Sequence, residues 1–201
     1  LLKRINNKTL RLIVRLALLT GLRKEELLTI PVHCISAPQS ISARSHVVVE
    51  LDPQEMSTKG DKPRTIHVPI SLLADLWDYV IHERHEAIRQ HGTDPKTLFV
   101  TAKGKSWSIR TSLNNSLNRL ALSFACHPHI LRHTYATHTL KSLMSRKSTT
   151  FNPLIYVRDR LGHSSITTTE KYLHFLDDIE DDLRTSYQEE IEETAKEAAW
   201  A

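Results

Sequence analysis

Hydrophobic residues recur at helical spacing along most of the chain. Leu12, Leu16 and Leu19 lie on one face of a helix, which predicts a helix over residues 7–20. Gly21 should end this helix, because Gly adopts the left-handed conformation without steric cost. Spacing and flanking residues together predict helices over residues 23–28, 71–90, 108–124, 129–143, 153–161 and 177–199, and a short helix that contains Tyr172 and begins at the capping-box pattern Thr167-Thr168-Thr169-Glu170.

Stretches rich in Val and Ile alternate with turn residues in the first half of the chain. They predict strands over residues 32–35, 46–51 and 65–68, and a brief strand or extended link over residues 98–100. Residues 56–63 have hairpin-turn chemistry and place Lys59 at the tip. The expected fold class is α+β, mostly helical with a small antiparallel β-sheet.

The charge is unevenly distributed. The net charge is +4, but residues 177–201 contain ten acidic and two basic side chains. Residues 1–176 therefore hold 25 of the 27 basic and 13 of the 23 acidic side chains, a net of +12. A body this basic suits a polyanion such as DNA, because each neutralised phosphate releases counterions. Charge alone is equally compatible with a soluble basic protein.

Other features of the composition bound the cellular setting. Basic residues interrupt every apolar run well short of the roughly 18 residues of a membrane span, so no membrane partner is expected. Cys34 and Cys126 have no Cys partner at zinc-site spacing, which argues against a disulfide scaffold or a zinc ribbon and favours a reducing, cytoplasmic location. The chain begins at Leu1 without a signal pattern, so it is either a processed chain or, as we favour, a piece of a larger protein.

Two groups of residues suggest phosphate chemistry. His129 and Arg132 are three residues apart just after Pro128, so they should project together from the first turns of a helix and bind an anion. His163 follows a helix-ending Gly, nine residues before Tyr172, and the two could meet. Taken singly, each pattern is also compatible with an ordinary surface pair or a core aromatic.

Three further candidate residues lie earlier in the chain. Arg23 and Glu26 share a helical face, so Glu26 could orient Arg23 or a His by a charge-assisted hydrogen bond, although a surface ion pair has the same spacing. Lys59 could protonate a leaving oxygen, although turn lysines are usually only solvated.

Five motifs, in this order, resemble those of the tyrosine recombinase (phage integrase) family. They are Thr20-Gly21-Leu22-Arg23-Lys24-Glu25-Glu26-Leu27, Lys59-Gly60, His129-x-x-Arg132-His133 with Ala136-Thr137-His138, Leu161-Gly162-His163-Ser164, and Lys171-Tyr172. The resemblance covers residues 10–175, and the ordered set is far more specific than any one motif. It implies the catalytic-domain fold of that family and the activity of a site-specific DNA recombinase or integrase.

The resemblance also implies how a DNA phosphate would be held. Arg23 and Arg132 would clamp the scissile phosphate, and Glu26 stands where the family has its supporting acidic residue. His129 and His163 would hydrogen-bond the phosphate and help to move protons. Fixed cations of this kind stabilise the charge of a pentavalent phosphorane.

The bond-making residues follow from the same resemblance. Tyr172 would attack the phosphate to give a 3′-phosphotyrosyl enzyme and a free 5′-hydroxyl, and Lys59 would be the general acid on the leaving 5′ oxygen. Because the tyrosyl link keeps the phosphodiester energy, the family needs no metal and no nucleotide cofactor.

Two departures from the family pattern concern the extent of the chain. The family has an N-terminal helical domain that completes a clamp around DNA, and the 201 residues leave no room for it. The segment Lys141–Asn152 is several residues longer than usual and is expected to be a surface loop. We expect a catalytic domain over residues 1–176 and an acidic helix or tail over residues 177–201.

The resemblance also suggests how copies assemble. The expected partners are double-stranded DNA, on which the enzyme should be nucleoid-associated, and the chain itself, as a tetramer on paired DNA sites and a monomer alone. Residues 177–199 should dock on a protein surface, in cis in the isolated chain and in trans on DNA, unless they are only a solvated acidic tail.

Several alternatives remain open from the sequence. A type IB topoisomerase would use much the same residues, and a non-catalytic DNA-binding protein would explain the basic body. A metal site at His129 and His133 lacks further ligands at convincing spacing. Six basic residues are candidate phosphate contacts: Lys62, Arg64, Lys103, Lys105, Arg110 and Arg119.

Overall fold

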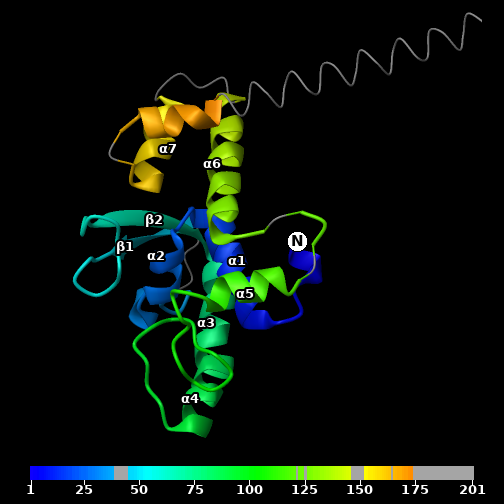
Figure 1. The fold of residues 1–201 in the computed structure, drawn as a ribbon. Helices are drawn as coiled ribbons and strands as arrows, with labels where there is room; N and C mark the ends of the chain where they lie inside the picture. The colour runs from blue at the N-terminus through cyan, green and yellow to red at the C-terminus, as the bar shows by residue number, and fades with distance from the viewer. Residues whose placement is uncertain (39–44, 121, 125, 146–151, 164, 174–201) are drawn as a thin grey trace, which may run out of the picture. The chain divides into compact units, whose positions relative to one another are not determined.

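The computed structural model describes residues 1–38, 45–120, 122–124, 126–145, 152–163 and 165–173 (Figure 1). They belong to two compact units. The first contains Leu1–Tyr135 and Arg160–Gly162, and the second contains Ala136–Asp159 and the chain from His163 on. The expected helix over residues 177–199 and the domain boundary at residue 176 lie outside the described residues.

Helix α1 (Lys8–Thr20) follows a short 3₁₀ turn, η1 (Leu2–Arg4), and contacts α2, α3 and β2. Asn7 caps its start, because the side-chain oxygen accepts a hydrogen bond from the Leu10 N–H at 2.7 Å. Gly21 ends the helix in the left-handed conformation, with φ 64° and ψ 22°. The predicted helix is confirmed, although Leu19 of the predicted stripe is 41% exposed.

Strands β1 (His46–Leu51) and β2 (Arg64–Pro69) form the antiparallel hairpin seen in Figure 1. Leu51 pairs with Arg64 at the turn end, and His46 pairs with Pro69 at the other end. The inward-facing apolar side chains are Val49, Leu51, Ile66 and Val68, which join one core with α1 and α3. The predicted strands at 46–51 and 65–68 are thus confirmed, and the Lys59 turn connects them.

The predicted strand at residues 32–35 is wrong. Val32–Cys34 form the 3₁₀ turn η2, stabilised by local hydrogen bonds such as Ile35 N–H to the Val32 carbonyl at 3.1 Å. The Val32 N–H donates instead to the Lys96 carbonyl at 2.9 Å, so the segment pairs with a loop and not with a strand. Tertiary pairing therefore overrides the β preference of these residues.

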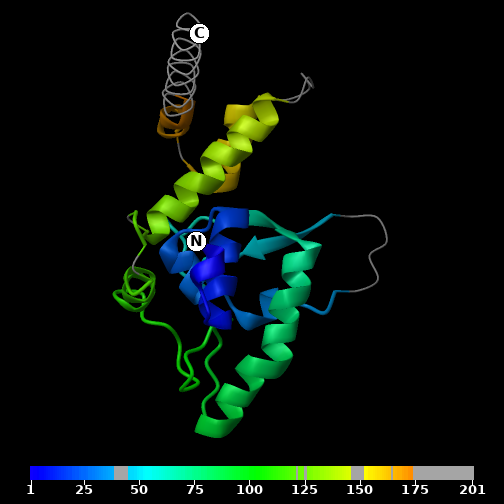
Figure 2. The same ribbon diagram turned by 90° about the vertical axis from the view of Figure 1, so that its right-hand side faces the viewer.

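A long helix follows β2 directly and contains a π-helical turn. Figure 2 shows α3 (Ile70–Tyr79), the π segment η3 (Val80–Arg84) and α4 (His85–His91) as one continuous helix. A single helix over 71–90 was predicted, without the π turn. Because π hydrogen bonds span five residues, Tyr79 and Arg84 come onto one side of the helix.

Both side chains hold the extended segment at residues 95–100. The Tyr79 hydroxyl accepts from the Val100 N–H at 3.0 Å, and the buried Arg84 donates to the carbonyls of Thr97 and Pro95. Val100 forms an isolated bridge with Ser106, so the extended link predicted at 98–100 is correct and a strand is not formed.

Helix α5 (Ser112–Asn118) is much shorter than the predicted helix over 108–124. Leu113 and Leu117 are buried as predicted, but Phe124 is 52% exposed. The Leu120 N–H donates to the Leu117 carbonyl in a tighter turn that ends the helix. Ser, Thr and Asn dominate this stretch, and their side chains compete for backbone hydrogen bonds, so the apolar period overestimated the helix.

The remaining helices match their predictions closely. Helix α6 covers Pro128–Met144, and α7 covers Pro153–Leu161, with the Asn152 side chain accepting from the Leu154 N–H at 2.9 Å. Residues 167–173 are helical and include Tyr172. Ser165 supplies the side-chain bond at this start, accepting from the Thr167 N–H at 3.2 Å, so the predicted capping role of Thr167 is wrong.

Gly21 provides a test of how closely the α1–α2 corner is packed. A Cβ at Gly21 would lie 2.4 Å from Cδ1 of Tyr135, whereas a Cβ at Gly92, which ends α4 with a similar φ of 60°, would meet nothing within 4 Å. Gly92→Ala should lower the free energy of unfolding by about 1 kcal/mol through backbone strain alone. Gly21→Ala should cost about 2 to 4 kcal/mol, because overpacking adds to the same strain.

Urea unfolding monitored by circular dichroism would measure both variants. Equal losses for the two alanine variants would contradict the close approach of Tyr135 to Gly21.

Candidate active site

Arg23 and Glu26 are fixed together at the start of α2 (Lys24–Thr29). Arg23 is the N-cap residue in an extended conformation, and its backbone N–H donates to Oε2 of Glu26 at 2.7 Å. Its guanidinium also donates to Oε1 of Glu26 at 3.2 Å. One carboxylate therefore holds both the backbone and the side chain of Arg23, as the spacing of the two residues allows.

Glu26 is fully buried, yet it is held as an anion by two arginines. Arg64, the first residue of β2, donates from Nε to Oε1 at 3.3 Å and from Nη2 to Oε2. Burial by itself would raise the pKa of Glu26, but Arg64 and then Arg23 outweigh it and hold the pKa below its usual value. The Glu26 carboxylate is therefore the anionic centre of a cationic cluster.

Three arginines donate to three consecutive carbonyl groups where α7 ends. Arg64 Nη1 donates to Arg160, Arg132 Nη2 donates to Leu161 at 2.6 Å, and Arg23 Nη2 donates to Gly162 at 3.1 Å. The last carbonyls of a helix have no partner within the helix and carry partial negative charge. The end of α7 therefore gathers arginines from α2, β2 and α6.

Arg132 connects these three carbonyls to the α1–α2 corner. Its Nη1 donates to the Gly21 carbonyl at 2.6 Å, and the residue is only 3% exposed. Arg23, the N-cap residue of α2, lies two residues after Gly21, so Arg23 and Arg132 are fixed around the same corner. The structure thus brings together Arg23, Glu26 and Arg132, although Arg132 lies more than a hundred residues after the other two along the chain.

Histidines surround the start of α6 beside Arg132. The ring centroids of His129 and His133 are 4.2 Å apart in an edge-to-face arrangement. The ring of His127 is stacked on that of His129, with the centroids 6.5 Å apart. Partial burial, followed by Arg132 and then His127, lowers the pKa of His129. A neutral His129 can accept as well as donate a proton near neutral pH.

Lys59 lies in the exposed turn between β1 and β2. The turn is joined to the end of α2, because the Ser57 N–H donates to the Thr29 hydroxyl at 3.0 Å, and Thr29 in turn donates to the Glu25 carbonyl at 2.8 Å. No ion pair of Lys59 occurs within the described part of the chain. Its ammonium therefore faces solvent on a turn anchored to the helix of Glu26.

His163 and Tyr172 form a second group, within the second unit. Their rings are nearly parallel, with centroids 6.4 Å apart. His163 Nδ1 lies 3.0 Å from the hydroxyl of Thr169, which is fully buried, and Tyr172 is 5% exposed. The Thr169 contact fixes the orientation of the imidazole. The stacked rings confirm, within this unit, the prediction that His163 and Tyr172 meet.

The predicted DNA contacts fall into two classes. Five are exposed, as a phosphate contact requires: Lys62, Lys103, Lys105, Arg110 and Arg119. Arg64 is different, because its side chain is 9% exposed and its guanidinium is bound to Glu26 and Arg160. The sequence places Arg64 beside a turn, as it does Lys62, Lys103 and Lys105, so nothing there separates its role from theirs.

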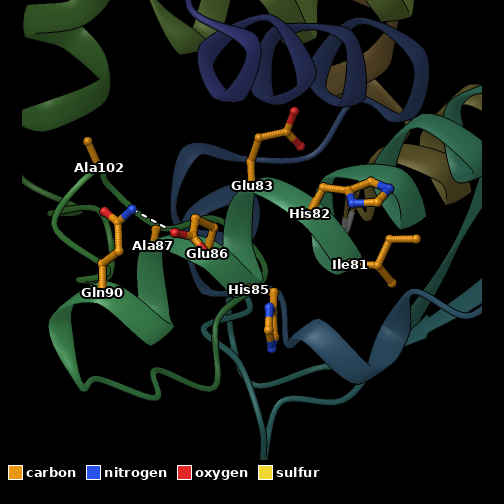
Figure 3. A pocket seen from close by; sticks show the side chains of 8 residues that line it. All are labelled: Ile81, His82, Glu83, His85, Glu86, Ala87, Gln90 and Ala102. Carbon is orange, nitrogen blue, oxygen red and sulfur yellow. Dashed lines mark hydrogen bonds between the residues drawn. The ribbon is translucent and has the colours of Figure 1, made fainter.

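A surface pocket elsewhere in the first unit contains none of the predicted site residues (Figure 3). It is lined by Ile81, His82, Glu83, His85, Glu86, Ala87, Gln90 and Ala102. Glu86 accepts from Gln90 and from Arg89, each at 2.7 Å, and the Arg89 contact lowers its pKa to about 2. Glu86, one of the two acids that line this pocket, is therefore already paired.

Among the residues that the structure describes, no group of three or more His, Cys, Asp or Glu side chains could hold a metal ion, so His129 and His133 gain no further ligand there. No helix in the same residues is long and apolar enough to cross a bilayer.

The chain matches one protein family and is similar in sequence to known recombinases. The sequence profile of the Phage integrase family matches residues 1–178. Tyrosine recombinase XerC of Oceanobacillus iheyensis is 33% identical over 134 residues, which are 64% of this chain and 40% of the relative. XerC of Anoxybacillus flavithermus is 31% identical over 139 residues, 67% of this chain and 43% of the relative. The chain thus matches less than half the length of these curated relatives.

Solved structures with the same fold include two recombinases. The XerA recombinase superposes with a TM-score of 0.64 at 22% identity, covering 92% of this chain and 59% of the other. XerH recombinase bound to its difH substrate in a pre-cleavage complex gives a TM-score of 0.63 at 20% identity, covering 85% of this chain and 46% of the other. These likenesses confirm the predicted fold.

The Glu26 carboxylate should contribute strongly to stability. Glu26→Gln removes the charge that balances Arg23 and Arg64 but keeps the side-chain shape, so it should lower the free energy of unfolding at neutral pH by about 3 to 5 kcal/mol. Glu25→Gln, a half-exposed neighbour on the same helix paired with Lys24 at 3.8 Å, should cost less than about 1 kcal/mol. Chemical denaturation of both variants would measure this difference.

The same carboxylate gives a predicted pH dependence. Because the folded-state pKa of Glu26 lies below its unfolded value near 4.5, its stabilisation is present above that pH and is lost as the pH falls through the folded pKa. Glu26→Gln should therefore flatten the acid limb of stability against pH. An acid limb identical to that of the unsubstituted protein would contradict the assignment.

Proposed function

The chain belongs to the phage integrase family, and on that premise we propose that it is the catalytic part of a site-specific recombinase. It cleaves and rejoins DNA strands through a 3′-phosphotyrosyl intermediate formed by Tyr172. The observation that supports this most directly is the gathering of Arg23 and Arg132 on the adjacent carbonyls of Gly162 and Leu161. Two guanidinium groups fixed so close together are suited to clamp one phosphate.

Arg23 is suited to bind an anion in this arrangement. Two of its five N–H donors are used by Glu26 and Gly162 within the described residues, and its side chain remains 18% exposed. Arg132 is almost completely buried, so its charge acts in a medium of low dielectric constant. Its attraction for an anion is therefore stronger than that of an arginine on the surface. Together they would stabilise the charge that develops on the phosphorane oxygens.

The proposed cleavage step balances without a cofactor. Oη of Tyr172 attacks the phosphorus, the bond from phosphorus to the 5′ oxygen breaks, and this oxygen takes a proton from Lys59. The phenol proton passes to a histidine, for which His163 beside Tyr172 and the neutral His129 are both suited. Attack of a 5′-hydroxyl on the tyrosyl phosphate reverses these steps and rejoins the strand.

Double-stranded DNA is the proposed substrate. The +12 charge of residues 1–176 and the exposed predicted contacts support it, as does the fold shared with XerH, which is bound to difH substrate. The proposed working form is a tetramer on paired sites, as expected of a recombinase. Family membership favours this activity over that of a type IB topoisomerase or a non-catalytic DNA-binding protein.

Tyr172→Phe tests the nucleophile. The protein would be incubated with nicked duplexes that carry a DNA sequence selected by binding from a random pool, and protein–DNA adducts would be separated on a denaturing gel. The unsubstituted protein should form an adduct and Tyr172→Phe none, while Tyr156→Phe on α7 should react normally. An adduct that persists in Tyr172→Phe would reject the assignment, and an adduct that needs a divalent metal would favour metal chemistry.

Lys59→Ala tests the general acid. On a normal phosphodiester this variant should cleave about 100-fold or more slowly, because the 5′ oxygen leaves without a proton. On a substrate with sulfur at the bridging 5′ position, the defect should almost vanish, since a thiolate is a good leaving group without protonation. Equal defects on both substrates would mean that Lys59 acts in another way; Lys62→Ala is the control on the same turn.

A further inference from the structure

We infer that Arg64 is a positioning residue for DNA cleavage and that it does not contact DNA. It holds in place Arg23 and the carbonyls at the end of α7. The inference rests on the proposed function, because it concerns the same phosphate-binding arginines. It assigns to Arg64 a role different from the one that its sequence context suggests.

The contacts of Arg64 are arranged as a bridge. Through Nε and Nη2 it binds both oxygens of Glu26, the same carboxylate that holds the backbone and side chain of Arg23. Through Nη1 it donates to the Arg160 carbonyl, next to the Leu161 carbonyl that accepts from Arg132. Arg64 therefore links the supports of both phosphate-binding arginines without being one of them.

The geometry requires an arginine. A planar guanidinium can bind a carboxylate in two-point fashion and still direct its other Nη to a carbonyl, whereas a lysine ammonium is a single point at the end of a flexible chain. Gly162 makes room for it, because a Cβ there would lie 3.0 Å from Cδ of Arg64. The side chain is also withdrawn from solvent, at 9% exposure, while nearby Lys62 is exposed.

Lys62 is therefore a matched control for Arg64. Both residues flank Pro63, and each would lose one positive charge on substitution by Met. If Arg64 only positions other groups, Arg64→Met should leave the affinity for DNA within about two-fold and leave the salt dependence unchanged. Lys62→Met, if it removes a phosphate contact, should reduce the slope of log affinity against log salt by about 1.

The test combines binding with single-turnover cleavage of a saturating nicked duplex that carries the selected DNA sequence. Arg64→Met should cleave about 100-fold more slowly than the unsubstituted protein, as expected for a misplaced phosphate-binding group. The amplitude of adduct formation should stay the same, because a variant that is merely less folded would lose amplitude in proportion to its unfolded fraction. Thermal unfolding monitored by circular dichroism gives the temperature at which all variants are folded.

Arg64→Lys covers the case in which the methionine variant does not fold. It keeps the charge but cannot bind Glu26 and Arg160 together, so it should also cleave at least about 10-fold more slowly with unchanged DNA affinity. Weaker DNA binding with a reduced salt slope in Arg64→Met, together with normal cleavage by Arg64→Lys, would overturn the inference. An unsubstituted protein that forms no adduct would instead reject the proposed function, and the salt slopes would still decide whether Arg64 contacts DNA.

Discussion

The buried carboxylate of Glu26 is the interaction on which the arrangement of the site depends. A single anion with no exposed surface binds the backbone and side chain of Arg23 and the guanidinium of Arg64. Removing such an anion would leave two cations with no compensating charge in a medium where burial is costly. The attraction of Arg64 and Arg23 opposes the cost of burying this carboxylate and holds the pKa of Glu26 below its usual value.

The end of α7 supplies the complementary constraint. The carbonyls at this helix end would have no hydrogen-bond partner in an isolated helix. Each of the three, at Arg160, Leu161 and Gly162, accepts a hydrogen bond from one arginine. Since these arginines come from β2, α6 and the start of α2, the helix end joins segments that are distant along the chain. The same hydrogen bonds that satisfy the helix end thereby orient the cations that we propose bind phosphate.

The candidate residues fall into groups that belong to different units. Arg23, Glu26 and Arg132 form the cationic group of the first unit, whereas His163 and Tyr172 stack in the second. One peptide bond, between Gly162 and His163, joins a member of the carbonyl group to the histidine beside the proposed nucleophile. The Leu-Gly-His motif therefore serves both groups: its carbonyls hold arginines and its imidazole faces Tyr172.

The sequence by itself determined most of the helices, the hairpin, the family and the pairing of Arg23 with Glu26, because these depend on local spacing, caps and motif order. It overestimated α5, where polar residues compete for the backbone, and it predicted a strand where Val32 pairs with a loop. Only the tertiary structure decided the environment of Arg64. Its sequence context is that of a basic residue after a turn, and whether such a residue faces solvent or a buried carboxylate depends on which distant segments fold against it.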